Sequence, residues 1–234
     1  MSRVFWWGIS AFFVVLLVIL FFFANGRSTG QSHSTVILCL GDSMTEGDFG
    51  GYPACLRRLT KTKFPGVRVL SAARPGHNSR EYVAFLRNSD VLRKYRPDIV
   101  LLMLGTNDAR TDGDKSSSNE FRDEMDRIVD MIHDAGIGKY RGAGAIFIAT
   151  IPPIFSIDLP NFSEESKRRI VGEINPEIRR MARERSLPLV DVERLFMENR
   201  ALLPGIHPNA SGYRKMAETF FAAIRPELRT VSTD

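Results

Sequence analysis

From residue 35 onward, short apolar runs alternate with longer amphipathic stretches. The apolar runs are rich in Val, Ile and Leu and leave few polar positions to face water, which is typical of strands in a parallel sheet covered on both faces. Pro188 places the last run at an edge of that sheet. The five predicted strands are TVILCL (35–40), VRVL (67–70), DIVLLMLG (98–105), GAIFIAT (144–150) and LPLVDV (187–192).

The stretches between these runs predict helices. Residues 117–135 carry apolar side chains at helical spacing and begin with a capping-box pair, Ser117 and Glu120. Residues 163–185 and 210–224 repeat the pattern, and Pro176 should kink or split the first of them. The alternation predicts a three-layer α/β domain over residues 35–230, with a mainly parallel five-stranded sheet and right-handed crossovers.

The N-terminus departs from this pattern. Residues 4–24 form an uncharged apolar segment of 21 residues, and roughly 20 suffice to cross a bilayer as a helix. We therefore expect residues 1–24 to be a single-pass transmembrane anchor, with the domain outside the cytoplasm. The alternative is a cleaved signal peptide and a secreted protein, but the apolar core is long and the cleavage pattern poor. Residues 25–34, rich in Gly and Ser, predict a flexible linker.

Charge and cysteine content exclude several classes of function. The net charge is +5 and the basic residues are scattered, which indicates solvated helix faces rather than a nucleic-acid surface. Cys39 lies in an apolar run and is predicted to be a buried thiol, and Cys55 has no metal-ligand spacing relative to it. No cluster of His, Asp, Glu or Cys has the spacing of a metal site, so we predict neither a metal nor another cofactor.

Polar motifs follow the ends of the predicted strands. GDSMTEG (41–47) follows the first, RPGHNS (74–79) the second, GTND (105–108) the third and IPP (151–153) the fourth. HPN (207–209) comes after the fifth strand and a short helical connection. Sites in open α/β sheets form at the carboxyl ends of the strands, so we expect these stretches to meet at one edge.

The residue types at this edge suit acyl transfer. Ser43 stands at a strand–helix turn, where it can be either an exposed nucleophile or an ordinary helix cap. The backbone N–H groups of Ser43 and Gly76 and the side-chain amide of Asn107 could stabilise an oxyanion. Taken singly, Gly76 also fits a plain Pro-Gly turn and Asn107 an Asx turn. Asp42 and Asp108 fit turn hydrogen bonding better than catalysis.

In this combination and order, the motifs resemble those of the SGNH (GDSL-type) hydrolase family, over about residues 35–225. Gly41-Asp42-Ser43 is similar to the first block of that family, Gly76 to the second, Gly105–Asp108 to the third and His207-Pro208-Asn209 to the last. The resemblance implies a flavodoxin-like sheet and a metal-free serine esterase or lipase-type acyl hydrolase. It implies Ser43 as nucleophile, Gly76 and Asn107 as oxyanion donors, and His207 as general base.

One position departs from the family pattern. The family carries an Asp three residues before the histidine, and here that residue is Pro204. A backbone carbonyl of residues 202–206 could orient the imidazole instead, giving a Ser–His dyad. Asp191 or Glu193, at the end of the last predicted strand, could also reach the ring. As a third possibility, the site is weakened into a binding module.

We therefore expect a membrane-tethered serine ester hydrolase that works through an acyl-enzyme. The alternatives are an acyltransferase or O-acetylesterase acting on envelope carbohydrate, and a binding module for carbohydrate or lipid. The expected partner is a small-molecule, lipid or acylated-carbohydrate ester. The sequence does not define the acyl length, the alcohol or the oligomeric state.

Overall fold

The structure is a computed structural model that describes residues 34–112, 116–137 and 145–231. The predicted anchor over residues 1–24, and all of the predicted linker except Ser34, lie outside the described residues. Within the described ranges, no helix combines the length and apolar character needed to span a membrane. The described residues from Ser34 onward form one compact unit.

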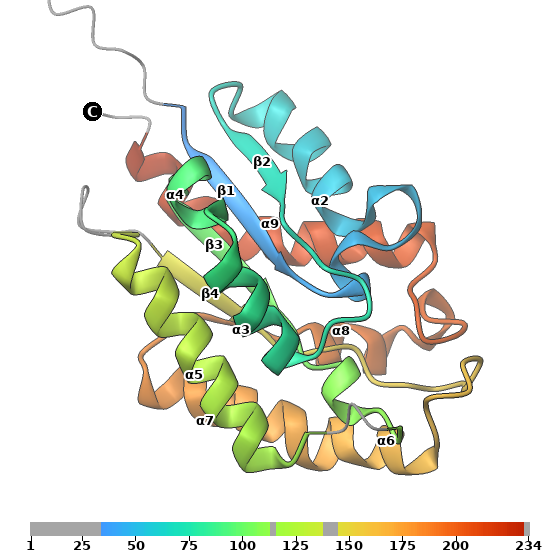
Figure 1. Ribbon diagram of the computed structural model, residues 1–234. Helices are drawn as coiled ribbons and strands as arrows, with labels where there is room; N and C mark the ends of the chain where they lie inside the picture. The colour runs from blue at the N-terminus through green and yellow to red at the C-terminus, as the bar shows by residue number, and fades with distance from the viewer. Residues whose placement is uncertain (1–33, 113–115, 138–144, 232–234) are drawn as a thin grey trace, which may run out of the picture. The chain divides into compact units, whose positions relative to one another are not determined.

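The centre of this unit is a five-stranded sheet in the order β2-β1-β3-β4-β5, with every neighbouring pair parallel (Figure 1). This arrangement confirms the predicted α/β class and places β5 at an edge, as Pro188 indicated. The order reverses between β1 and β3, so the chain leaves those two strands in opposite directions across the sheet. The strands are β1 (Val36–Gly41), β2 (Arg68–Ser71), β3 (Ile99–Met103), β4 (Ala145–Ala149) and β5 (Leu189–Val190).

Helices cover both faces of the sheet (Figure 1). On one face α2 (Ser43–Lys63) and α9 (Ala210–Val231) pack side by side, and their contact includes stacked rings of Tyr52 and Phe220. On the other face α3 (Ser79–Asn88), α5 (Ser118–Asp134) and α7 (Asn175–Glu184) form a row. Shorter elements complete the chain: α4 (Val91–Tyr95), α6 (Glu164–Arg169), α8 (Val192–Glu198) and the 3₁₀ turns Asn107–Ala109 and Arg200–Leu202.

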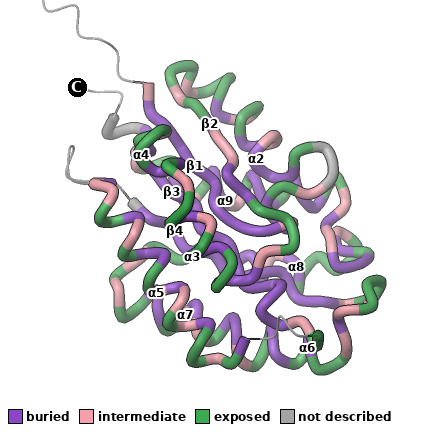
Figure 2. The backbone as a smooth tube through the Cα atoms, in the orientation of Figure 1, coloured by how far each residue is buried: buried purple, intermediate pink, exposed green. Residues whose placement is uncertain are grey.

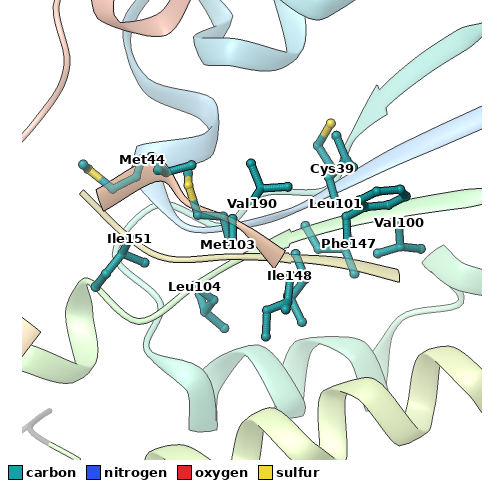
Figure 3. Close-up of a cluster of buried hydrophobic side chains, with 14 of the residues drawn as sticks. Cys39, Met44, Val100, Leu101, Met103, Leu104, Phe147, Ile148, Ile151 and Val190 are labelled. Atoms are coloured by element: carbon teal, nitrogen blue, oxygen red, sulfur yellow. The ribbon is translucent and has the colours of Figure 1, made fainter. Parts of the chain in front are cut away.

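The central strands are buried along their whole length, as their composition predicted (Figure 2). Side chains from both sides of β3 and β4 fill the space under the helices (Figure 3). Cys39 is fully buried in this core and forms no disulfide, and burial raises the pKa of its thiol to about 12. The prediction of a buried thiol at this position is confirmed.

The predicted helix over residues 163–185 is split, as Pro176 suggested. α6 and α7 are separated by a wider, π-type turn at Ile170–Ile174. Pro176 has no N–H to donate to the carbonyl four residues earlier, so regular α-helical bonding cannot continue through this point. Next to the turn, buried Asn175 uses its side chain to bond both the N–H and the carbonyl of Ile151, at 2.8 and 3.0 Å. This contact holds the loop that follows β4.

Candidate active site

Ser43 is the first residue of α2, directly after β1. The cap of this helix is Asp42, whose Oδ1 accepts a 2.8 Å hydrogen bond from the N–H of Met44. The reading of Ser43 as a plain helix cap is therefore wrong, and its hydroxyl is available for another partner. Its backbone N–H belongs to the helix start, where N–H groups have no partner within the helix.

That partner is His207, from the loop between the last 3₁₀ turn and α9. Nε2 of the imidazole lies 2.9 Å from Oγ of Ser43. With the ring proton on Nδ1, the serine hydroxyl donates to Nε2, which is the contact a general base needs. Asn209 holds the loop on its C-terminal side: its N–H donates to the carbonyl of Leu202 at 3.0 Å, and its Oδ1 accepts from the N–H of Gly212 at 2.9 Å.

Gly76 occupies a tight turn after β2. The N–H of His77 donates to the carbonyl of Arg74 at 3.1 Å, and Gly76 has a φ of +82°. Proline followed by a residue with positive φ is the signature of a type II turn, and the N–H of that residue is not used by the turn. A second bond, from the N–H of Arg74 to the carbonyl of Gly41 at 2.8 Å, ties this turn to the end of β1.

Asn107 begins the 3₁₀ turn that follows β3. It is buried, and its Nδ2 donates a 3.0 Å hydrogen bond to the carbonyl of His77, next to Gly76. An amide nitrogen carries two hydrogens, so the second can reach a substrate oxygen. Because β2, β1 and β3 are neighbours, the loops of Gly76, Ser43 and Asn107 leave the same edge of the sheet at its switch point.

A buried polar network supports Asn107. The carboxylate of Asp108 accepts from the backbone and hydroxyl of Ser79, at 3.0 and 2.5 Å, and from the hydroxyl of Ser116 at 2.9 Å. Arg169, 2% exposed, donates to the backbone carbonyls of Asp108 and Ser116 and pairs with Glu173. Burial raises the pKa of Asp108, while the hydrogen bonds from both serines act in the opposite sense. Asp108 therefore has the hydrogen-bonding role that its position predicted.

Asp42 is the other buried carboxyl group beside the candidate nucleophile. Burial, reinforced by the nearby charge of Asp108, raises the pKa of Asp42 to about 7. Among the described residues, its Oδ2 has no hydrogen-bond partner. The side chain is thus a helix cap that keeps a proton more readily than an exposed aspartate does.

Neither predicted substitute for the missing acid is in place. Arg179 binds Asp191 at 2.8 Å and Glu193 at 2.7 Å, and Asp191 also caps α8. Although partial burial works the other way, the hydrogen bonds of Arg179 and of the Arg194 N–H hold the pKa of Asp191 below its usual value. Among the described residues the His207 ring bonds only Ser43, so no carbonyl of residues 202–206 accepts from it either.

Sequence reasoning missed two polar residues that touch this region. The scattered basic residues were expected on solvated helix faces, but Arg169 in α6 is buried beside the polar loop that precedes α5. Asp158 lies in the loop between β4 and α6, and its Oδ1 accepts a 3.2 Å hydrogen bond from the N–H of Ile206. Its signal in the sequence is an aspartate in a loop that leaves the same edge of the sheet as the predicted site.

The arrangement places a hydroxyl, an imidazole and several N–H donors at one sheet edge, and these are the groups that serine-dependent acyl transfer uses. Comparison with known proteins agrees. The chain belongs to the GDSL-like Lipase/Acylhydrolase family, whose model matches residues 39–215.

Two curated relatives and one solved structure are informative. The chain is 28% identical to an acetylxylan esterase of Xylanibacter ruminicola over 81% of its length and 43% of the relative. It is 27% identical to a multidomain esterase of Ruminococcus flavefaciens over 62% of its length and 18% of the relative. The chain thus spans less than half of either relative. An acetylxylan esterase from Geobacillus stearothermophilus shares the fold, with a TM-score of 0.65, 21% identity, and coverage of 81% and 94% of the two chains.

Proposed function

We propose that the protein is a serine esterase that removes short acyl groups, acetyl above all, from carbohydrate. The observation that carries the catalytic part is the 2.9 Å contact between Ser43 and His207 at the switch point of the sheet. Support for the substrate comes from the relatives that are named acetylxylan esterases.

In this proposal, the Ser43 oxygen attacks the acyl carbon while its proton passes to Nε2 of His207. The carbonyl oxygen becomes an oxyanion, which the N–H groups of Ser43 and Gly76 and the Asn107 amide stabilise. The sugar hydroxyl then leaves with the proton from His207, and the acyl group stays on Ser43. Water, deprotonated by His207, then attacks the acyl carbon. The bond from this carbon to the Ser43 oxygen breaks, Ser43 takes back the proton from His207, and the carboxylic acid is released.

Labelling tests the nucleophile. A fluorophosphonate probe should modify Ser43 in the wild type, and Ser43→Ala should lose both the label and the hydrolysis of p-nitrophenyl acetate. Ser211→Ala, which changes an exposed serine on α9, is the matched control and should keep both. Labelling that survives in Ser43→Ala would refute the assignment.

Substrate comparison tests the acyl and alcohol groups. Acetylated xylo-oligosaccharides should be cleaved with release of acetate, and long-chain p-nitrophenyl esters and lysophospholipids should be poor substrates. Transfer of acetate to a second sugar, followed by mass spectrometry, would instead indicate an acyltransferase. Faster cleavage of long-chain esters would favour a lipase-type enzyme.

The same proposal includes a membrane anchor formed by residues 4–24. Its support is the uncharged length of that segment in the sequence. Fractionation of cells that express the full chain should recover the esterase with membranes, on the outer side of the bilayer. Soluble enzyme whose mature N-terminus lies near residue 25 would show instead that the segment is a cleaved signal peptide.

A further inference from the structure

The loop that carries His207 is fixed by side chains on its two sides. Downstream, Asn209 bonds the loop to the preceding 3₁₀ turn, donating from Nδ2 to the carbonyl of Ala201 at 3.0 Å. Upstream, the contact comes from Asp158, 48 residues away in the chain, which accepts from the N–H of Ile206. The residue it holds is therefore the immediate neighbour of the imidazole.

Gly205 shows how closely this carboxylate fits the loop. A Cβ atom built on Gly205 would clash with Oδ2 of Asp158, and would lie 2.9 Å from its Cγ and 3.4 Å from its Oδ1. These are the three nearest atoms among the described residues, so the severe clash is with this carboxylate. The carboxylate occupies the space that a side chain at residue 205 would need.

We propose that Asp158 is the positioning residue for His207. Its carboxylate fixes the backbone of Gly205 and Ile206 from across the sheet edge and so keeps Nε2 within reach of the Ser43 hydroxyl. The inference rests on the proposed roles of Ser43 and His207. It assigns to a different loop the support that residue 204, a proline, cannot give with its side chain.

Substitutions of Asp158 and Gly205 test the hydrogen bond to Ile206 and the packing against Gly205. Asp158→Ala removes the acceptor and should lower kcat roughly 10- to 100-fold with KM nearly unchanged, since small misplacements of a reacting group have effects of this size. Asp158→Asn keeps an oxygen for Ile206 and should restore most of the activity. Gly205→Ala should lower kcat as Asp158→Ala does, because its methyl group displaces the carboxylate.

The double variant gives the sharpest result. In an Asp158→Ala background the carboxylate that clashes with a methyl group at residue 205 is gone, so Gly205→Ala should not lower kcat further. The matched control is Asp90→Ala, an exposed aspartate that makes no side-chain bond to its helix, and it should behave as wild type. Multiplying losses in the double variant, or a wild-type kcat in Asp158→Ala, would overturn the inference.

The rate at which the fluorophosphonate labels Ser43 separates this inference from the proposed function. It reports on the serine and the histidine without a sugar substrate, and should fall in Asp158→Ala in parallel with kcat at temperatures well below unfolding. If the wild type is not labelled at Ser43, the proposed function fails. If the wild type is labelled and Asp158→Ala is labelled equally fast, only the positioning role fails.

Discussion

Asn107 lies beside a buried network of charged side chains, whereas the loop that contains His207 is held by an exposed side chain, Asp158. Under Asn107, Asp108 receives bonds from two serines and Arg169 ties its backbone to that of Ser116. We call this half of the site the oxyanion side. The histidine side consists of residues 203–209 and Asp158. Within the described part of the chain, its supporting side chains, Asp158 and Asn209, bond only to backbone groups, and Asp158 does so from an exposed position.

The two sides of the site should respond differently to the loss of a supporting side chain. Removing one partner of a buried charge network leaves other charged or polar groups without partners, which costs about 3–5 kcal/mol. Losing a single partly exposed hydrogen bond costs only about 0.5–1.5 kcal/mol. Substitutions on the oxyanion side should therefore lower the stability of the fold. Substitutions on the histidine side should instead displace His207 from Ser43 while the protein stays folded.

Substitution of Arg169 should have the largest effect. Arg169→Met leaves the carbonyls of Asp108 and Ser116 and the Glu173 carboxylate without their partner, so the free energy of unfolding should fall by about 3–5 kcal/mol. Urea denaturation measures it. Arg168→Met is a close control, because Arg168 reaches the same Glu173 at 3.5 Å from an exposed position and should cost less than about 1 kcal/mol. Equal losses in both variants would contradict the comparison.

Asn107→Ala should come next. The amide acts on charge that develops in the transition state, so kcat should fall roughly 10²–10³-fold and KM should change little. Steady-state kinetics on p-nitrophenyl acetate measure both constants. This loss should exceed that of Asp158→Ala, which only displaces the base. A change confined to KM would count against an oxyanion role.

Asp42→Asn should give a smaller, pH-dependent effect on stability. Between about pH 4 and pH 7 the folded protein keeps a proton on Asp42 that the unfolded chain has released, so this group lowers wild-type stability as pH rises. The asparagine can still cap α2 but cannot ionise. The variant should therefore gain in Tm relative to wild type at pH 8, and gain little at pH 4. A Tm difference that is the same at both pH values would contradict this account.

The amide variants of the Arg179 cluster should have the smallest effects. Asp191→Asn and Glu193→Gln each break a partly exposed ion pair, worth about 0.2–1 kcal/mol of stability. Because Arg179 holds both carboxylates, kcat should stay within a few-fold of wild type. A displaced triad acid would instead cost about 10⁴-fold. A loss of that size in either folded variant would place a carboxylate at His207 after all.

The layout of the domain follows from local patterns in the sequence. Buried strands read as unbroken apolar runs, and the capping box at Ser117 begins α5 one residue from its predicted start. The last strand was predicted too long, because only Leu189–Val190 find a partner in β4. A strand at the sheet edge is limited by its single neighbour, and the length of that pairing cannot be read from the run itself.

The residues expected to share one sheet edge do so, because parallel strands bring their carboxyl ends together. The supports of those residues were not predictable in the same way. Asp158 and Arg169 act on backbone groups far away in the chain, and no periodicity marks such contacts. Asp191, at the end of the last strand, was expected within reach of His207, but Arg179 binds it instead. A charge partner on another helix leaves no trace in sequence spacing.

The Ser43–His207 contact spans 164 positions of the chain. During synthesis the nucleophile, the Gly76 turn and Asn107 leave the ribosome well before the histidine does, and domains fold as their chain emerges. The hydroxyl therefore stays without its base until α9 packs beside α2. Under the proposed function, the appearance of labelled Ser43 on a lengthening nascent chain would therefore mark the docking of the C-terminal helix, the last step of folding.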